Sequence, residues 1–387
     1  MLKKNSALSS MPLTPVTDFN RPVYCLLGLP FDAITVRGAI DHLRQAAAQK
    51  QACFLSTPNL NFLIGSSHDP ALRDSVIESD LSVADGMPIV WLARLLGLPI
   101  VERVAGSNVF QQLGQQMPRP MSVYFFGGQQ GVADMACKKL NAMNSMNATS
   151  ATAAGLHCVG VQYPGLGTVE EMSGQERIDQ INASGADFLV VALSARKGQA
   201  WIQHNRARIA VPVISHLGAV VNFVAGTVKR APVWMQRAGL EWLWRIKEEP
   251  ALRQRYSADG AALLRLLWTR VLPYAWFLWR HPASTSEMAK ATLELLQQQQ
   301  HTRITLTGAW TAHNLAPLRP CFAQACLTAQ DITLELARLT YLDSALIGLL
   351  MLLHGSQQQR ARRLHLCNVS PQVKAILRWN GAEFLLS

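Results

Sequence analysis

The feature that most constrains this chain is a series of short apolar runs, rich in β-branched and aromatic residues, separated by segments long enough to form helices. These runs lie between Val23 and Val221 and read VYCLLGLPF, ACFLSTPN, SVYFFGG, LHCVGVQY, DFLVVALS and VPVISHLG. Buried strands that alternate with helices are typical of an α/β domain with a parallel sheet. We therefore predict a Rossmann-like domain whose ligands bind at the carboxyl ends of the strands.

The rest of the chain differs in character and predicts further parts. With 387 residues the chain can form two domains, each with its own core. A second alternation begins with RITLTG, continues through DITLELARL and RRLHLCN, ends with the short strand EFLLS, and predicts a small α/β domain. We expect, in order, a flexible leader at 1–22, the Rossmann-like domain at 23–228, an appendage at 229–282, a linker at 283–300 and the small domain at 301–387.

The charge of the chain indicates an anionic partner. Lysine and arginine number 36 and the acids 25, which gives a formal net charge of +11. Nucleic acid, phospholipid headgroups and nucleotide or lipid diphosphates all carry the opposite charge. Because no recognition motif for DNA or RNA accompanies the basic residues, we expect no nucleic-acid partner.

Basic residues concentrate in the appendage, where tryptophans lie between them. The stretch AALLRLLWTRVLPYAWFLWRHP mixes leucine, tryptophan and arginine, and we expect Pro273 to break its helix. Two interpretations are open. The segment lies in a membrane interface, which aromatic and arginine anchors favour, or it forms a helical hairpin on the core of its own domain.

The cysteines and the apolar runs indicate where the protein works. The seven cysteines are scattered and include no CxxC pair, which favours a reducing compartment and disfavours a zinc site. We expect no membrane span, because no run of about 18 uncharged apolar residues is present. The first residues lack the apolar core of a secretory signal, so we expect the protein in the cytoplasm.

Polar residues follow the predicted strands at the edge where a ligand is expected. Thr57 and Asn59 follow one strand, and Asp85 follows the next. Taken by themselves, these residues have simpler explanations. The T-P-N sequence is an ordinary turn, and Asp85 can cap the next helix with Gly86 easing the turn.

Several longer motifs, taken in order, carry a resemblance to a known family. They read STPNLNFL, SDLSVADGMPIVWLARLLGLPIVERVAGSNVF, FFGGQQGVA and NFVAGTVKRAPVWMQRAGLEWLWRIKEEPALRQRY. Over about residues 23–260 the chain resembles the WecB/TagA/CpsF family of glycosyltransferases. Within that family it is similar to the N-acetylmannosaminyltransferases. The resemblance implies transfer of a sugar, with inversion, from a UDP-sugar to a polyprenyl-diphosphate-linked acceptor at the cytoplasmic membrane, with no cofactor and no metal.

The resemblance also implies roles for particular residues. It makes Asp85 the general base that takes the proton of the acceptor hydroxyl, a step for which a positioned carboxylate is suited. It places Thr57 and Asn59 in the lining of the site. Arg103 corresponds to a site arginine, whose planar fork suits phosphate or carboxylate oxygens. The alternative for Arg103 is a surface ion pair with Glu102.

A second group of residues is implied to bind the nucleotide sugar. Glycines between a strand and a helix let backbone N–H groups approach a nucleotide, and they are Gly127, Gly128 and Gly131. Lys197 and Gln199 lie where the family usually reads G-x-P-K-Q-E-x-W, and we take both as substrate-binding. This chain departs from that pattern, because Gly198 stands at the glutamine position and Gln199 at the glutamate position. Asn222 stands where an acid is common.

Arginines of the appendage are implied to contact the leaving diphosphate. The candidates in WRIKEEPALRQRY are Arg245, Arg253 and Arg255. Positive charge at this point stabilises the departing UDP. The alternative is a solvated basic helix.

The last part of the chain, about residues 300–387, resembles a STAS domain. Its most telling stretch is LTYLDSALIGLLMLLHG, in which Asp343 and Ser344 begin an apolar helix. The resemblance implies a protein partner, and it makes Ser344 a candidate regulatory phosphorylation site, where added charge changes partner binding. The alternative is that Ser344 only caps the helix.

Two functions from different classes follow. The first is an inverting glycosyltransferase of surface or exopolysaccharide synthesis, bound peripherally to the inner face of the bacterial cytoplasmic membrane, with a STAS module that recruits or senses a partner. The second is a catalytically silent scaffold that binds a nucleotide sugar and acts through the STAS domain. The altered residues 194–200 motivate the second function.

Overall fold

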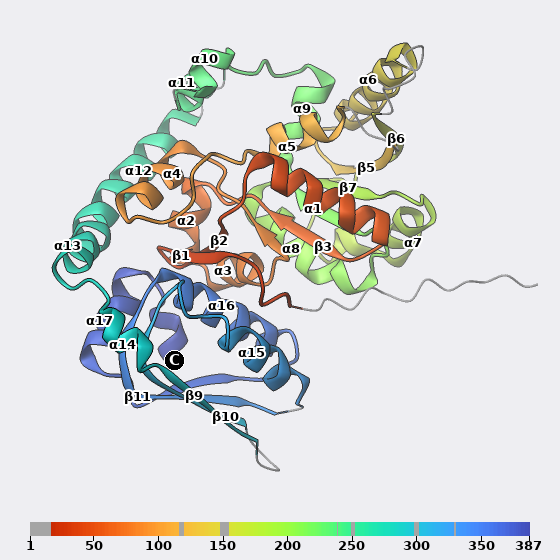
Figure 1. Cartoon of the computed structure of the whole chain (residues 1–387). Coiled ribbons are helices and arrows are strands. Elements are labelled where there is room, and N and C mark those ends of the chain that lie inside the picture. Colours follow the sequence, from red (N-terminus) through yellow and green to blue (C-terminus); the bar gives the residue numbers. More distant parts are fainter. Residues whose placement is uncertain are drawn as a thin grey trace, which may run out of the picture. The chain divides into compact units, whose positions relative to one another are not determined.

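The computed structural model describes most of the chain, and Figure 1 labels its elements. The described residues are 17–115, 120–147, 155–237, 239–248, 252–297, 302–328 and 330–387. The chain divides into two compact units, and each is described by itself. Within the described residues, the first unit comprises Ile40–Phe54 and Phe110–Val228, and the second comprises Thr17–Ala39, Leu55–Val109 and Lys229–Ser387.

A six-stranded sheet confirms the predicted Rossmann-like architecture. Its strand order is β4-β3-β8-β7-β5-β6, and the registered neighbours run parallel. The strands are β3 (Cys53–Ser56), β4 (Leu81–Ser82), β5 (Met121–Gly127), β6 (Leu156–Gln162), β7 (Phe188–Ala192) and β8 (Val213–His216). The central strands are fully buried, which explains why they appear in the sequence as unbroken apolar runs.

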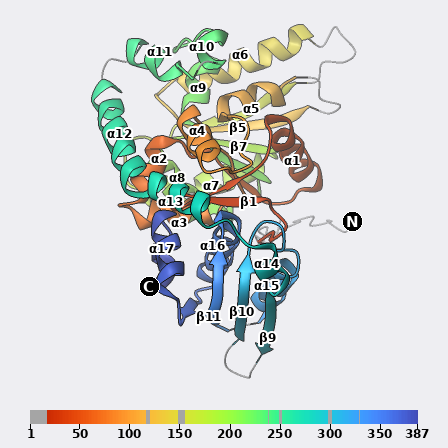
Figure 2. The same cartoon turned by 60° about the vertical axis from the view of Figure 1, so that its left-hand side comes forward.

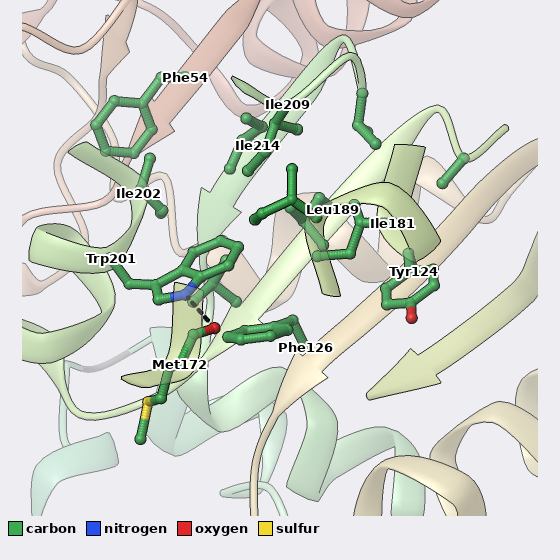
Figure 3. Packing of buried hydrophobic residues seen from close by; sticks show 14 residues of the cluster. Phe54, Tyr124, Phe126, Met172, Ile181, Leu189, Trp201, Ile202, Ile209 and Ile214 are labelled. Atoms are coloured by element: carbon green, nitrogen blue, oxygen red, sulfur yellow. Dashed lines mark hydrogen bonds between the residues drawn. The ribbon is translucent and has the colours of Figure 1, made fainter. Parts of the chain in front are cut away.

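The first unit has an aromatic core on one face of its strands. The indole of Trp201 stacks on Phe126 with ring centroids 4.2 Å apart, and its Nε1–H donates to the carbonyl of Met172 (Figure 3). The helices of this unit are α6 (Val132–Asn147), α7 (Gln175–Ala183), α8 (Ala195–Asn205) and α9 (Gly218–Ala225), with short 3₁₀ turns at Glu171–Ser173 and Arg206–Arg208. Two further helices, α1 (Val36–Gln49) and α5 (Gly106–Leu113), have residues in both units.

One disulfide lies in the first unit. Cys137 of α6 and Cys158 of β6 are bonded, with their Cα atoms 5.2 Å apart. The spacing of the cysteines did not predict this pair, because 21 positions separate the two residues and no CxxC motif marks them.

The second unit begins with an antiparallel hairpin where the sequence predicted a strand of the main sheet. The run VYCLLGLPF forms β1 (Val23–Leu26) and β2 (Leu29–Asp32), which pair with each other. Leu27 and Gly28 turn the chain with φ angles of 49° and 91°. The prediction was wrong because a continuous apolar run does not reveal a tight turn inside it.

The second unit also contains the helices of the basic appendage. Its helices before the small domain are α2 (Leu60–Ser66), α3 (Pro70–Ile77), α4 (Met87–Leu95), α10 (Val233–Arg237), α11 (Glu241–Glu248), α12 (Leu252–Leu266), α13 (Leu272–Arg280) and α14 (Thr285–Ala289). A π-helical turn at Leu267–Val271 joins α12 to α13.

Pro273 does not break the helix, contrary to the prediction. It lies in the first turn of α13, directly after the π-helical turn. Proline is tolerated in a first turn, and the wider turn before it changes the register of the hydrogen bonds. The helical path therefore continues from Leu252 to Arg280.

The small domain is built on a four-stranded sheet of order β12-β11-β10-β9 (Figure 2). Strands β10, β11 and β12 run parallel, and β9 is antiparallel to β10. The strands are β9 (Thr292–Gln297), β10 (Thr302–Trp310), β11 (Ile332–Leu342) and β12 (Leu364–Cys367), and the helices are α15 (Leu318–Leu327), α16 (Ser344–Gln358) and α17 (Pro371–Trp379). Two segments differ from expectation: β9 occupies part of the expected linker, and the expected strand EFLLS is a 3₁₀ turn at Glu383–Leu386.

Helix α16 packs directly on the hairpin within the second unit. A Cβ atom on Gly348 would lie 2.9 Å from the carbonyl oxygen of Val23, so only glycine permits this approach. The hydroxyl of Ser344 donates to the carbonyl of Cys25 at 2.8 Å. The hairpin and α16 are therefore one packed assembly.

Candidate active site

Backbone hydrogen bonds hold three loops together at the carboxyl ends of β3 and β4. The N–H of Asp85 donates to the carbonyl of Pro58 at 3.1 Å, and the N–H of Val104 donates to the carbonyl of Ala84 at 2.9 Å. The pairing of the two strands therefore continues beyond their ends and takes in a third segment. The predicted site residues carried by these loops are Thr57, Asn59, Asp85 and Arg103.

Asp85 does not cap the helix that follows it. Helix α4 begins at Met87, its N-cap position is occupied by Gly86, and no side chain caps it. Gly86 has a φ angle of 146°, which an L-residue rarely adopts, so the chain turns here through glycine. The capping interpretation is therefore wrong, and α4 makes no use of the carboxylate.

The electrostatics of Asp85 favour a carboxylate of increased basicity. Burial raises its pKa, and the charge of Glu241 raises it further. Arg103 and Arg245 lower the pKa, as does the N–H of Gly106 at the start of α5. Burial is the largest effect, and the net direction is upward.

Asn59 shapes the loop beside Asp85. Its Oδ1 atom accepts hydrogen bonds from the N–H groups of Asn61 and Phe62 and so caps α2. Its Cβ lies 3.9 Å from the position that a Cβ on Gly86 would take. The cap uses the oxygen of the side-chain amide. Thr57 is buried in the same loop.

Arg103 pairs with Glu241 of the appendage and not with Glu102. Its Nη1 atom lies 2.7 Å from Oε2 of Glu241, and both side chains are largely buried. Glu102 instead accepts from the backbone N–H of Val36. The surface ion pair considered for Arg103 is therefore wrong, and its partner lies 138 positions further along the chain.

Two further arginines belong to this charge cluster. Arg245 lies one helical turn after Glu241, with its Nε 4.0 Å from Oε1 of that residue. Arg230 donates to Ser107 and Asn108. Burial lowers the pKa of Arg230, while the charge of Glu241 opposes that shift.

The remaining appendage arginines occupy a different setting. Arg253 and Arg255 are exposed on α12. The guanidinium of Arg255 lies 5.1 Å from the ring centroid of Tyr256, and its charge lowers the pKa of Asp259, which burial raises. Of the three arginines predicted to contact a diphosphate, Arg245 is the one whose charge acts on Asp85.

The predicted nucleotide-binding glycines lie in the first unit, at the ends of β5 and β7. A Cβ on Gly127 would lie 2.8 Å from the carbonyl oxygen of Ala192, so the two strand ends approach closely. The N–H of Gly128 donates to the same carbonyl at 2.7 Å. Gly127, Gly128 and Gly131 all have positive φ angles.

The altered motif lies on α8 in the same unit. Lys197 donates to the carbonyl of Gly167 at 2.7 Å, and Gln199 is 1% exposed. A Cβ on Gly198 would lie 2.2 Å from Cδ2 of His216, so the imidazole occupies the space of any side chain at position 198. His216 also bonds the carbonyl of Leu193, and burial lowers its pKa.

Ser344 lies in the small domain and is 3% exposed. The cap of α16 is Asp343, whose Oδ1 accepts from the N–H groups of Ala345 and Leu346. The hydroxyl of Ser344 is directed to Cys25, as described above.

Sequence reasoning missed two members of the cluster around Asp85. Glu241 is an acid in the first turn of a basic helix, and Arg230 lies within the run KRAP. Both belong to the motifs that carried the resemblance, and that was the available signal. Their contacts with Arg103, Ser107 and Asn108 join distant parts of the chain.

No helix among the described residues combines the length and apolar character needed to cross a bilayer. In those same residues, no group of three or more histidine, cysteine or acidic side chains is placed to hold a metal ion.

A parallel sheet with a partly buried acid and arginines beyond its strand ends, followed by a small α/β domain, is consistent with a Rossmann-like glycosyltransferase that carries an added module. Comparison with known families agrees. Residues 24–275 match the Glycosyl transferase WecG/TagA/CpsF family, and residues 293–387 match the Mlab, STAS domain. The chain belongs to the WecG/TagA/CpsF family and is a glycosyltransferase.

Two relatives carry the same printed name, N-acetylglucosaminyldiphosphoundecaprenol N-acetyl-beta-D-mannosaminyltransferase. The protein of Bacillus spizizenii is 24% identical over 208 residues, which cover 54% of this chain and 76% of the relative. The protein of Bacillus subtilis (strain 168) is 25% identical over 229 residues, which cover 57% of this chain and 82% of the relative.

Proposed function

We propose that the protein transfers a sugar, with inversion, from a UDP-sugar to a polyprenyl-diphosphate-linked saccharide in bacterial surface polysaccharide synthesis. The observation that carries the proposal is the partly buried carboxylate of Asp85 among the arginines beyond the strand ends. The names of the relatives support a lipid-diphosphate acceptor and an N-acetylmannosamine donor.

Asp85 is the general base of the proposed reaction. The acceptor hydroxyl attacks the anomeric carbon, its proton passes to Asp85, and the bond from the anomeric carbon to UDP breaks. A carboxylate with a raised pKa is a stronger base than an exposed aspartate, which suits this step. Thr57 and Asn59 orient hydroxyl groups in the same loop.

The arginine cluster holds diphosphate. Arg103, Arg230 and Arg245 are close enough that their charges act on one another's pKa or on that of Asp85. Guanidinium groups bind phosphate oxygens in pairs, and positive charge stabilises UDP as it leaves. Exposed Arg253 and Arg255 extend this charge along α12.

The donor is bound through the first unit. Positive φ angles at Gly127, Gly128 and Gly131 let backbone N–H groups approach the nucleotide, and Lys197 and Gln199 of α8 contact the donor. These assignments follow the family resemblance.

The protein works peripherally on the inner face of the cytoplasmic membrane. Helix α12, the π-helical turn and helix α13 expose large apolar side chains between arginines, and these are Leu264, Trp268, Leu272, Trp276 and Trp279. The opposite side packs inward through Val271, Tyr274 and Phe277. An amphipathic helical segment with exposed tryptophan and arginine suits a lipid interface. The STAS domain supplies regulation or recruitment of a protein partner.

The test is sugar transfer by the purified chain. UDP-N-acetylmannosamine and a panel of other UDP-sugars are offered with a short-chain polyprenyl-diphosphate-linked N-acetylglucosamine, and product and released UDP are measured. We expect turnover with one donor and a loss of about 10²–10⁴-fold in Asp85→Asn, because a general base contributes that much. Asp179→Asn, an exposed aspartate of α7, is the control. Wild-type turnover in Asp85→Asn would show that another group is the base.

A second function rests on the altered motif of α8. His216 fills the space beside Gly198, so this chain has no side chain where the family pattern has glutamine. A protein without that contact can act as a silent scaffold that binds a nucleotide sugar and signals through the STAS domain. Tight UDP binding by calorimetry with no turnover across the donor panel would favour this function.

A further inference from the structure

We propose that Glu241 is a positioning residue for the transfer reaction, which holds the guanidinium of Arg103 away from the carboxylate of Asp85 so that Asp85 stays available to accept a proton. The inference rests on the proposed function, and it assigns a role to an acid that the sequence analysis did not single out.

The geometry of the ion pair supports this role. Arg103 lies in the loop before α5, and the backbone of this loop bonds to the loop that contains Asp85. Glu241 lies in the first turn of α11. Their atoms are 2.7 Å apart, and the side chains are only 11% and 14% exposed. Charge-assisted hydrogen bonds between largely buried groups are strong, and their geometry is well defined. Glu241 therefore fixes where the charge of Arg103 lies.

The alternative partner of Arg103 is Asp85. In the part of the chain that the structure describes, Arg103 pairs with Glu241, yet its charge is the strongest of those that lower the pKa of Asp85. A direct pair between arginine and aspartate lowers the pKa of the acid by about 1–3 units. A base weakened in that way accepts the acceptor's proton less readily.

The pKa of Asp85 also depends on the other charged groups that face it. Arg245 of the same helix lowers the pKa of Asp85, as does the N–H of Gly106. Arg230, from the segment before α10, interacts with the charges of both Asp85 and Glu241. Three cations therefore surround one base, and Glu241 is the acid that offsets them.

The test measures the protonation of Asp85 directly. Aspartate side chains of the full protein are labelled with ¹³C at the carboxyl carbon, and the resonance that disappears in Asp85→Asn identifies Asp85. The pKa of that resonance is then compared between the wild type and the variants. We expect Glu241→Gln to lower the pKa by about one unit. We expect Arg103→Gln to raise it, because a cation is lost.

The opposite signs separate positioning from a general structural role, since a loosened fold would move both pKa values in the same direction. Glu248→Gln removes the same charge from the exposed end of α11 and should leave the pKa of Asp85 unchanged. When Arg103 is already replaced by glutamine, the further change Glu241→Gln should shift the pKa of Asp85 less than it does in the wild type. The reason is that Glu241 acts through Arg103. An unchanged pKa in Glu241→Gln, or shifts of one sign in both single variants, would overturn the inference.

Steady-state kinetics provide a second test of the role of Glu241. The acid limb of the kcat/KM profile should move to lower pH in Glu241→Gln, with kcat reduced about three- to tenfold at the optimum, and Glu241→Asp should restore part of the loss. If the wild type transfers no sugar, the proposed function fails, while the titration still decides whether Glu241 controls the state of Asp85.

Discussion

At the scale of the residue, Asp85 combines a charge with burial, and the two oppose each other. Burial raises the pKa of its carboxyl group, so the folded protein binds that proton more tightly than the unfolded chain does. The stabilisation is complete at low pH, below the unfolded pKa of about 3.9. It is lost as pH rises from that value through the raised folded pKa. At neutral pH the ionised carboxylate therefore costs stability.

We accordingly expect Asp85→Asn to be more stable than the wild type by about 1 kcal/mol at neutral pH, because asparagine has a similar shape and no charge. The difference should grow between about pH 4 and the folded pKa of Asp85 and stay constant above it. Urea denaturation from pH 4 to pH 8 measures this.

Asp179→Asn removes an exposed aspartate and should show no such growth. A wild type that is as stable as Asp85→Asn at pH 8 would mean that the carboxylate carries no burial cost.

Some residues of the candidate site could be predicted from the sequence and others could not, for a physical reason. Asn59, Asp85 and Arg103 follow strand ends or lie in a motif, so position along the chain marks them. Glu241 joins the cluster through its side-chain contact with Arg103, and a contact across 138 positions has no periodicity to reveal it. Whether Asp85 caps α4 depended on where that helix begins, which is least certain in a sequence.

At the scale of the element, the helical path from Leu252 to Arg280 has one packed face and one exposed face. Tyr274 and Phe277 pack toward Trp379 of α17, with ring centroids 6.3 and 5.3 Å away. Trp268 and Trp279 are 72% and 73% exposed. The inner face packs on the core of its own unit, as the second interpretation expects, but the segment is one continuous helical path and the expected hairpin is wrong. The outer face presents aromatic side chains, and its contact with a membrane stays a prediction.

We expect the double variant Trp268→Ser/Trp279→Ser to lose at least tenfold in affinity for vesicles that contain anionic lipid, because exposed indoles anchor a helix at the lipid interface. Vesicle cosedimentation at low and high salt measures this, and high salt should weaken the remaining binding through the arginines.

The control for the tryptophan variant is Leu327→Ser, which removes an exposed apolar side chain from α15. Equal vesicle binding by the wild type and the tryptophan variant would remove the membrane role from this face.

The elements of the main sheet were predictable because each central strand is an unbroken buried run. The hairpin and the π-helical turn were not. Burial on both sides gives β1 and β2 the same apolar composition as a central strand, and only the turn at Leu27 and Gly28 separates them. At Pro273 the missing N–H suggested a break, while a π-helical turn keeps the helix continuous.

At the scale of the whole molecule, the STAS domain and the hairpin share one packed surface within the second unit. Ser344 is buried there against Cys25, and Gly348 meets the backbone of Val23. Arg319 donates to the carbonyls of Phe19 and Arg21. The small domain therefore packs against the N-terminal hairpin and the residues just before it.

Ser344→Asp should lower the free energy of unfolding by about 3 kcal/mol or more, because it buries a second carboxylate directly beside that of Asp343. Ser344→Ala should cost only about 1 kcal/mol, the value of one hydrogen bond. Thermal or urea unfolding separates the two variants.

Ser286→Asp adds the same charge at an exposed position of α14 and should be neutral. If Ser344→Asp is as stable as the wild type, the contact with Cys25 opens readily, and a phosphate at Ser344 would be accommodated.

The hairpin packs against some of the last elements of the chain, so its packing is completed late in synthesis. Cys25 bonds the carbonyl of Asn380, a partner 355 positions later. At a translation rate of about 5–20 residues per second, the hairpin leaves the ribosome tens of seconds before that partner exists. During this interval β2 can already contact α3 and β4, while β1 still waits for α16. The transferase matures only after translation has passed α17.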